Sequence, residues 1–128
     1  MQRPPPIIGS ERVVAYSPID NRHRHTGNTR QIVAGVLMGP AAGLAICRTS
    51  HGYFYLFGCD KQWNSVTDTF HDTIADAMAQ AEFEYEGVTR TWQTLDPAAR
   101  TEVWLRVMGV MSSGTATAAM RNTGFTCR

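Results

Sequence analysis

Residues 44–87, LAICRTSHGYFYLFGCDKQWNSVTDTFHDTIADAMAQAEFEYEG, decide the fold class because their hydrophobic period changes at His71. Before His71, apolar and β-branched residues come in short runs separated by turn residues, which is typical of strands. After it, apolar residues recur at the spacing of one helical face: Ile74, Ala77, Met78, Ala81 and Tyr85. Strands followed by a helix predict an α+β domain with an antiparallel sheet.

Working outward, we predict a sheet of four to five strands. The candidate strands are residues 12–16, 31–38, 44–48, 53–59 and 65–70. Residues 31–38 are apolar and β-branched, so we expect a buried strand there. The turn at residues 49–52 would pair Ile46 with Tyr55, which leaves both faces of that hairpin apolar. The hairpin is therefore expected to be central, or to have its second face covered by another helix or another subunit.

Two helices are expected after the sheet. Thr73 is a suitable N-cap with Asp76 three residues later, and Gly87 is a suitable stop, which predicts a helix over residues 73–86. Asp96-Pro97 is typical of a helix start and predicts a second helix over residues 97–111. Residues 1–10 are a proline-rich lead that should stay extended, and residues 112–128 form a low-complexity tail rich in Ser, Thr, Ala and Gly.

Length and charge exclude several protein classes. A chain of 128 residues is one domain, and 43% hydrophobic with 18% charged residues excludes a disordered protein. The net charge of +1 argues against a nucleic-acid binder. That charge is an average, because residues 60–86 carry one Lys against seven acidic residues and the flanking segments are rich in Arg. With three cysteines, no apolar segment long enough to cross a bilayer and no signal peptide, we expect a cytoplasmic protein.

The first candidate site is a loop over residues 20–30 that contains no large apolar side chain. Its basic and imidazole residues are Arg22, His23, Arg24, His25 and Arg30. Such a cluster can bind an anion, an acidic partner or a nucleic-acid backbone, and such binding should tighten in mild acid. A metal site would need a third ligand that the local sequence does not supply. The plainer alternative is a solvated loop without a binding role.

The second candidate site is the acidic end of the first helix, with Glu82, Glu84 and Glu86. Glu82 and Glu86 lie one turn apart. Like charges at that spacing repel, and both lie at the negative end of the helix dipole. Either a structural partner such as Arg90 compensates them, or they bind a protein. Phe83 would be the aromatic centre of such an acidic surface if it is exposed; the alternative is that it packs under the second helix.

Four further residues are candidates for binding or chemistry. Trp63 lies in a polar turn and is the tryptophan expected to be exposed and available to a partner. Asp68 and His71 could form a carboxylate–imidazole pair for general-base catalysis; the alternative is that they brace the junction between strand and helix. Cys59 would need a stabilised thiolate to act as a nucleophile, and Asp60 opposes this.

The pattern over residues 53–92 resembles one found in small uncharacterised bacterial proteins. The motifs that carry the resemblance are Phe-Gly-Cys-Asp (57–60), Trp-Asn (63–64), Thr-Asp-Thr (67–69), His71, Gln-Ala-Glu-Phe-Glu-Tyr-Glu-Gly (80–87) and Trp92. The resemblance implies one compact hairpin-plus-helix unit and no particular activity.

These observations favour a small non-enzymatic protein-interaction module, of an immunity-type or regulatory kind. We expect an unidentified protein partner, with self-association as an alternative, and no cofactor, metal or membrane. The binding residues would be Arg22, His23, Arg24, His25, Arg30, Trp63, Glu82 and Glu86. Two alternatives stay open: a small-ligand or hydrolytic domain that uses Asp68 and His71, and an anion or nucleic-acid contact through residues 22–30.

Overall fold

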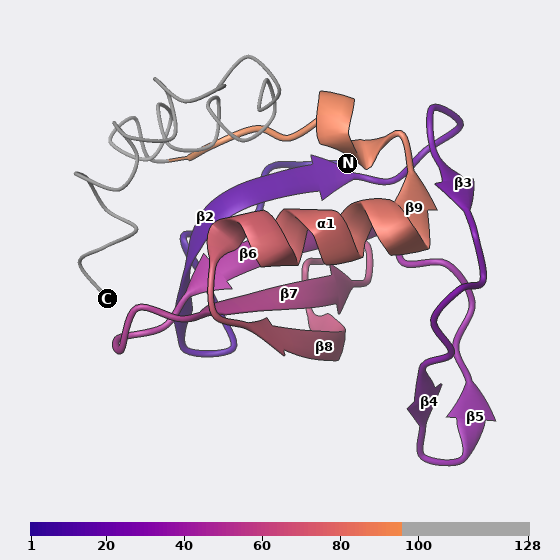
Figure 1. Cartoon of the computed structure of the whole chain (residues 1–128), viewed down its shortest axis with the longest axis horizontal. Helices are drawn as coiled ribbons and strands as arrows, with labels where there is room; N and C mark the ends of the chain where they lie inside the picture. Colours follow the sequence, from indigo (N-terminus) through magenta and orange to yellow (C-terminus); the bar gives the residue numbers. More distant parts are fainter. Residues whose placement is uncertain (96–128) are drawn as a thin grey trace.

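A computed structural model describes residues 1–95, so the predicted helix over 97–111 and the tail over 112–128 lie outside the described residues. The described part is an antiparallel sheet of five strands in the order β1-β2-β6-β7-β8, with a helix across one face (Figure 1). The sheet strands are β1 (Ile7–Ile8), β2 (Glu11–Pro18), β6 (Gly43–Arg48), β7 (Phe54–Cys59) and β8 (Ser65–His71). The other elements are β3 (Arg24–His25), β4 (Ile32–Val33), β5 (Val36–Leu37), α1 (Ile74–Glu84), β9 (Tyr85–Glu86) and a 3₁₀ turn (Val88–Arg90). The α+β class is confirmed.

The helix α1 begins where the capping pattern predicts. The side chain of Thr73 accepts a hydrogen bond from the backbone N–H of Asp76 at 3.1 Å, which satisfies one of the free donors of the first turn. The helix ends at Glu84, two residues before the predicted end. The reason is that Tyr85 and Glu86 leave the helix to pair with β3 as strand β9.

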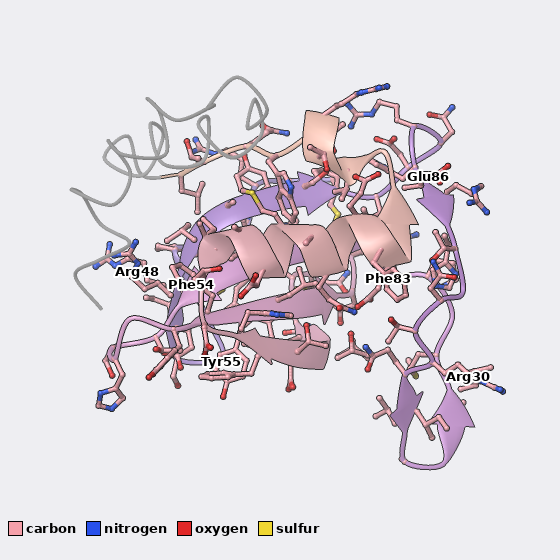
Figure 2. All side chains as sticks on the ribbon, viewed as in Figure 1. Arg30, Arg48, Phe54, Tyr55, Phe83 and Glu86 are labelled. Atoms are coloured by element: carbon pink, nitrogen blue, oxygen red, sulfur yellow. The ribbon has the colours of Figure 1, made fainter. Side chains whose placement is uncertain are left out.

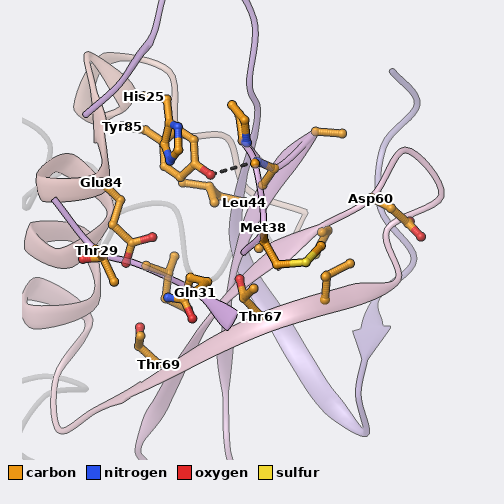
Figure 3. Close-up of a pocket in the computed structure, with 18 of the residues that line it drawn as sticks. His25, Thr29, Gln31, Met38, Leu44, Asp60, Thr67, Thr69, Glu84 and Tyr85 are labelled. Atoms are coloured by element: carbon orange, nitrogen blue, oxygen red, sulfur yellow. Dashed lines mark hydrogen bonds between the residues drawn. The ribbon is translucent and has the colours of Figure 1, made fainter. Parts of the chain in front are cut away.

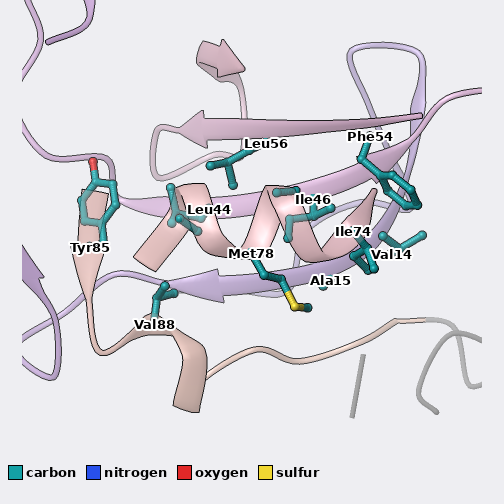
Figure 4. Packing of buried hydrophobic residues seen from close by; sticks show 12 residues of the cluster. Val14, Ala15, Leu44, Ile46, Phe54, Leu56, Ile74, Met78, Tyr85 and Val88 are labelled. Atoms are coloured by element: carbon teal, nitrogen blue, oxygen red, sulfur yellow. The ribbon is translucent and has the colours of Figure 1, made fainter. Parts of the chain in front are cut away.

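The main hydrophobic core lies between α1 and the sheet (Figure 4). It contains the predicted helix stripe together with alternate residues of the central strands. Its buried members are Val14, Ala15, Leu44, Ile46, Phe54, Leu56, Ile74, Ala77, Met78, Ala81, Tyr85 and Val88. Successive residues of a strand point to opposite faces of the sheet. The strand residues that do not face the helix therefore belong to a second cluster on the far side of the sheet.

Trp63 belongs to that second cluster, and the prediction that it is exposed is wrong. Its side chain is buried, with 4% of the residue exposed, and its indole Nε1–H donates to the carbonyl oxygen of Gln2 at 2.8 Å. The ring lies edge-on to Tyr16, with 5.8 Å between centroids. Asp60 closes the turn by accepting from the backbone N–H of Asn64, which lets Trp63 fold back onto the sheet. The N-terminal lead thus helps to cover the second face.

The register of the central hairpin differs by one residue from the prediction. Ile46 pairs with Leu56 rather than Tyr55. Beyond the strand ends, the N–H of Thr49 donates to the carbonyl oxygen of Tyr53 at 2.8 Å, so the turn inside this bond contains the three residues 50–52. Gly52 supplies the positive φ of 84° that such a turn needs. This register places Leu56 against the helix and Tyr55 on the far side of the sheet.

Residues 31–38 do not form a buried strand, so that prediction is wrong. They fold back on themselves as a two-stranded ribbon, β4 and β5, which we call the arm (Figure 1). Ala34 (φ 52°) and Gly35 (φ 79°) both have the positive φ that a two-residue hairpin turn requires. The sequence correctly indicates extended backbone here, but the arm projects from the body and its apolar side chains are exposed.

Candidate functional site

A pocket of about 270 Å³ lies between the base of the arm, the C-terminal end of α1 and strands β7 and β8 (Figure 3). Its apolar lining comes from the arm base, the following segment and the central strands: Met38, Pro40, Ala41, Leu44 and Leu56. Its polar lining includes His25, Thr29, Gln31, Thr67, Thr69, Glu84 and Tyr85. An apolar pocket with a few convergent polar groups is the usual form of a small-molecule site.

Glu84 is the buried charge of this pocket, with 8% of the residue exposed. Its carboxylate accepts a hydrogen bond from the side-chain amide of Gln80 at 2.6 Å, one helical turn earlier. The same amide donates to the hydroxyl of Thr29 at 3.2 Å, which links α1 to the segment before the arm. Burial raises the pKa of Glu84, and the amide of Gln80 and the nearby His25 oppose that rise.

One wall of the pocket is a stacked pair, His25 on Tyr85, with 5.1 Å between ring centroids. The pairing of β3 with β9 sets these two residues opposite each other. The hydroxyl oxygen of Tyr85 accepts from the backbone N–H of Ala41 at 2.8 Å, and burial raises the pKa of this phenol. The wall is therefore fixed from two sides.

Cys59 also lines the pocket but is not an activated nucleophile. Burial and the neighbouring Asp60 raise the pKa of its thiol to about 12, so the thiol is protonated at neutral pH. Burial also raises the pKa of Cys47, the other cysteine of the described residues.

The structure brings the two predicted binding clusters together on another surface. The loop that carries Arg22 and Arg24 lies against the end of α1, where β3 pairs with β9. Arg24 contacts both carboxylate oxygens of Glu86, with Nη2 at 3.2 Å from Oε2. Arg22 pairs with Asp20 at 2.9 Å, and its hydrogen bonds lower the pKa of Asp20 to about 2. Arg22 and Arg24 therefore each form an ion pair with an acidic residue of the same chain.

His23 has a structural place in the same region. Its side chain is fully buried; Nδ1 accepts from the backbone N–H of Asp20 at 3.1 Å, and Nε2 lies 2.8 Å from the hydroxyl of Thr91. Since Nδ1 accepts, Nε2 carries the proton in the neutral ring and donates to Thr91. His23 thereby joins the loop to the segment after the 3₁₀ turn.

Glu82 closes the chain reversal after α1. Its carboxylate accepts from the backbone N–H of Gly87 at 2.9 Å, and from the backbone N–H and hydroxyl of Thr89 at 3.0 and 2.6 Å. Burial opposes ionisation, but these bonds and a smaller effect of Arg90 lower the pKa of Glu82. The compensation predicted from Arg90 comes mainly from Thr89 and backbone groups. Phe83, which lies between Glu82 and Glu84 in the sequence, is 52% exposed.

The predicted pair of Asp68 and His71 does not form. Three residues apart on β8, they point to opposite faces of the strand. The ring of His71 instead contacts the hydroxyl of Thr69 at 2.7 Å, and burial lowers the pKa of His71 against the opposing effect of Asp76 and Asp72. No general-base site is built from these residues.

Arg30 and His25 occupy different surroundings from the rest of the loop. His25 belongs to the pocket wall, whereas Arg30 is exposed beside the arm (Figure 2). The predicted cluster over residues 22–30 is thus divided between internal ion pairs, the pocket and the arm base.

The sequence places Glu84 in the acidic end of the helix, but neither its burial in the pocket nor its partner Gln80 was predicted. The available signal was the position of Glu84, three residues after Ala81 on the buried side of the helix. A carboxylate at an apolar position of a helix face needs a compensating partner, and one turn earlier the helix carries Gln80.

No family model, curated protein or solved structure matches this chain. Within residues 1–95, no cluster of three or more metal-ligating side chains is found. The helix of that part of the chain is too short to cross a membrane.

Proposed function

We propose that the chain is a small non-enzymatic protein-interaction module whose contact element is the arm. The observation that carries this proposal is the exposure of four apolar side chains on one projecting ribbon. Their exposed fractions are 65% for Ile32, 39% for Val33, 61% for Val36 and 54% for Leu37.

The arm gains little stability from its own contacts. A ribbon with two paired residues in each strand buries almost no apolar surface, and isolated hairpins are marginal in water. Clustered apolar side chains on a monomer usually mark an interaction site. We infer that the apolar residues of the arm contact a partner protein. The exposed edges of the two arm strands can also pair with a strand of that partner.

Arg30 indicates the character of that partner. It is the one charged residue in the sequence from Thr29 to Pro40, and it lies exposed at the base of the arm. A protein groove with an apolar floor and an acidic rim would complement both features, since arginine makes bidentate contacts with carboxylates. An immunity-type or regulatory role is consistent with such a contact.

Site-specific photo-crosslinking tests the proposal. A benzophenone side chain at Leu37, in cells that make the protein, should capture one protein, and the same probe at Ser50 in the exposed loop after β6 should not. The double variant Ile32→Thr and Val36→Thr should remove the capture while keeping extended-strand propensity. Equal capture from both positions, or capture that survives the double variant, would refute the arm as the contact element.

The affinity of the captured protein provides a second measurement. The four side chains are roughly half exposed, so burying two of them contributes about 2 kcal/mol, equivalent to roughly 30-fold in Kd. Reversal by Arg30→Glu should weaken binding further and remove its salt dependence. Sedimentation of the purified chain alone distinguishes this complex from self-association, the alternative in which the captured protein is a second copy.

A further inference from the structure

We propose that the pocket at the base of the arm binds a primary ammonium group attached to a short apolar body. This inference is independent of the arm's protein partner, because it rests on the cavity and on the buried carboxylate inside it. The volume of about 270 Å³ is suited to a small organic molecule.

The carboxylate of Glu84 gives the pocket its preference for a cation. A carboxylate can accept about four hydrogen bonds, and among the described residues Gln80 supplies its one protein donor. The ion pairs of that part of the chain involve Asp20 and Glu86, and none involves Glu84. A buried charge without a counter-ion is costly, and an ammonium group supplies the charge and three N–H donors together.

The groups around Glu84 are arranged to receive those donors. Figure 3 shows the carboxylate pointing into the pocket beside Thr29 and Gln31, with Met38 and Thr67 across from it. The hydroxyl of Thr29 and the amide oxygen of Gln31 are acceptors, so they can share the ammonium group with the carboxylate.

The rest of the lining favours an apolar body on the ligand. Leu44, Leu56 and Pro40 contribute hydrocarbon surface to the same cavity. Each methylene removed from water there should raise affinity by up to about fourfold. Asp60 and Lys61 carry opposite charges and both line the pocket, so they largely cancel. His25 lines it too and attracts the Glu84 carboxylate, so Glu84 decides the charge preference where the His25 ring is neutral.

Titration with hexylamine, followed by amide NMR shifts and calorimetry, tests this site. Hexanol is the neutral control of similar size, and hexanoate is the anionic control. We expect hexylamine to bind at least tenfold more tightly than hexanol, hexanoate not to bind, and the shifts to centre on pocket residues such as Ala41 and Thr67. Equal affinity for hexylamine and hexanol, or shifts at the surface acids instead, would overturn the proposal.

Two kinds of variant locate the binding. Glu84→Gln keeps the size of the side chain and its bond with Gln80, so it should lower hexylamine affinity at least tenfold and remove the preference over hexanol. Thr67→Phe should fill the pocket and block both ligands, whereas Asp76→Asn, which removes an exposed carboxylate of the same helix outside the pocket, should bind like the wild type. Retention of the amine preference in Glu84→Gln, or unchanged binding in Thr67→Phe, would contradict the assignment.

A primary ammonium occurs both in free amines and in the lysine side chain of a protein. Nα-acetyl-lysine N-methylamide separates these sources, because its backbone amides must stay outside the pocket. Binding as tight as that of hexylamine assigns the site to a protein's lysine, and weaker binding assigns it to a free amine. Failure of both probes to bind overturns the proposal.

Discussion

Replacing the buried carboxylate of the pocket should stabilise the protein. Burial raises the pKa of Glu84, so in the pH range between the ordinary carboxyl pKa and the raised native value the folded state binds more protons than the unfolded state. The free energy of unfolding therefore falls as pH rises through this range and stays low above it. Glu84→Gln carries no charge and should lose this pH dependence.

The structure sets the magnitude of the effect. The glutamine oxygen can still accept from Gln80, whose amide lies 2.6 Å from the carboxylate, and the weaker neutral hydrogen bond costs about 1 kcal/mol. Removing a buried charge that has no ion-pair partner raises the free energy of unfolding by more than this, since effective desolvation penalties reach several kcal/mol. We expect a net gain of about 1 kcal/mol at neutral pH, or about 4 °C in Tm.

Urea denaturation from about pH 4 to about pH 8 measures both the gain and its pH dependence. Glu82→Gln is the matched control on the same helix, because three hydrogen bonds hold Glu82 and its pKa is lowered. The stability that Glu82 contributes is present above the ordinary carboxyl pKa and is lost as pH falls through the lowered value. Glu82→Gln should therefore destabilise at neutral pH. If Glu84→Gln destabilises as well, with the same pH profile, the pocket carboxylate is an ordinary structural group and the reasoning is refuted.

Substitutions at three other positions test the fold by urea denaturation. Trp63→Phe loses the hydrogen bond to Gln2 and should cost about 1 kcal/mol, against about 3–5 kcal/mol for Trp63→Ala; a cost below about 0.5 kcal/mol for Trp63→Ala would mean that the indole is not buried. Thr73→Ala removes the helix cap and should cost about 1 kcal/mol, while Thr73→Ser should cost little. Gly87→Ala should cost about 1–3 kcal/mol, because φ is 103° and a Cβ would lie 2.7 Å from the carbonyl oxygen of Arg22. Unchanged stability would mean that the loop carrying Arg22 does not pack against Gly87.

Local sequence determined the class and most of the regular elements. The strands predicted at 44–48, 53–59 and 65–70 form within a residue or two of their expected bounds, because alternation and turn residues act over short distances. The N-cap at Thr73 and the apolar stripe of α1 are equally local features. Each of these depends on neighbours that the sequence itself places together.

Tertiary structure decided which of those elements are buried and which charges meet. The apolar run over residues 31–38 projects as the arm, and Trp63 packs against the N-terminal lead; composition alone suggested the reverse in both cases. The bond between Arg24 and Glu86 joins residues 62 positions apart, and Glu84 becomes a pocket residue because the arm base passes in front of it. Burial and pairing depend on such long-range contacts, which no local pattern specifies.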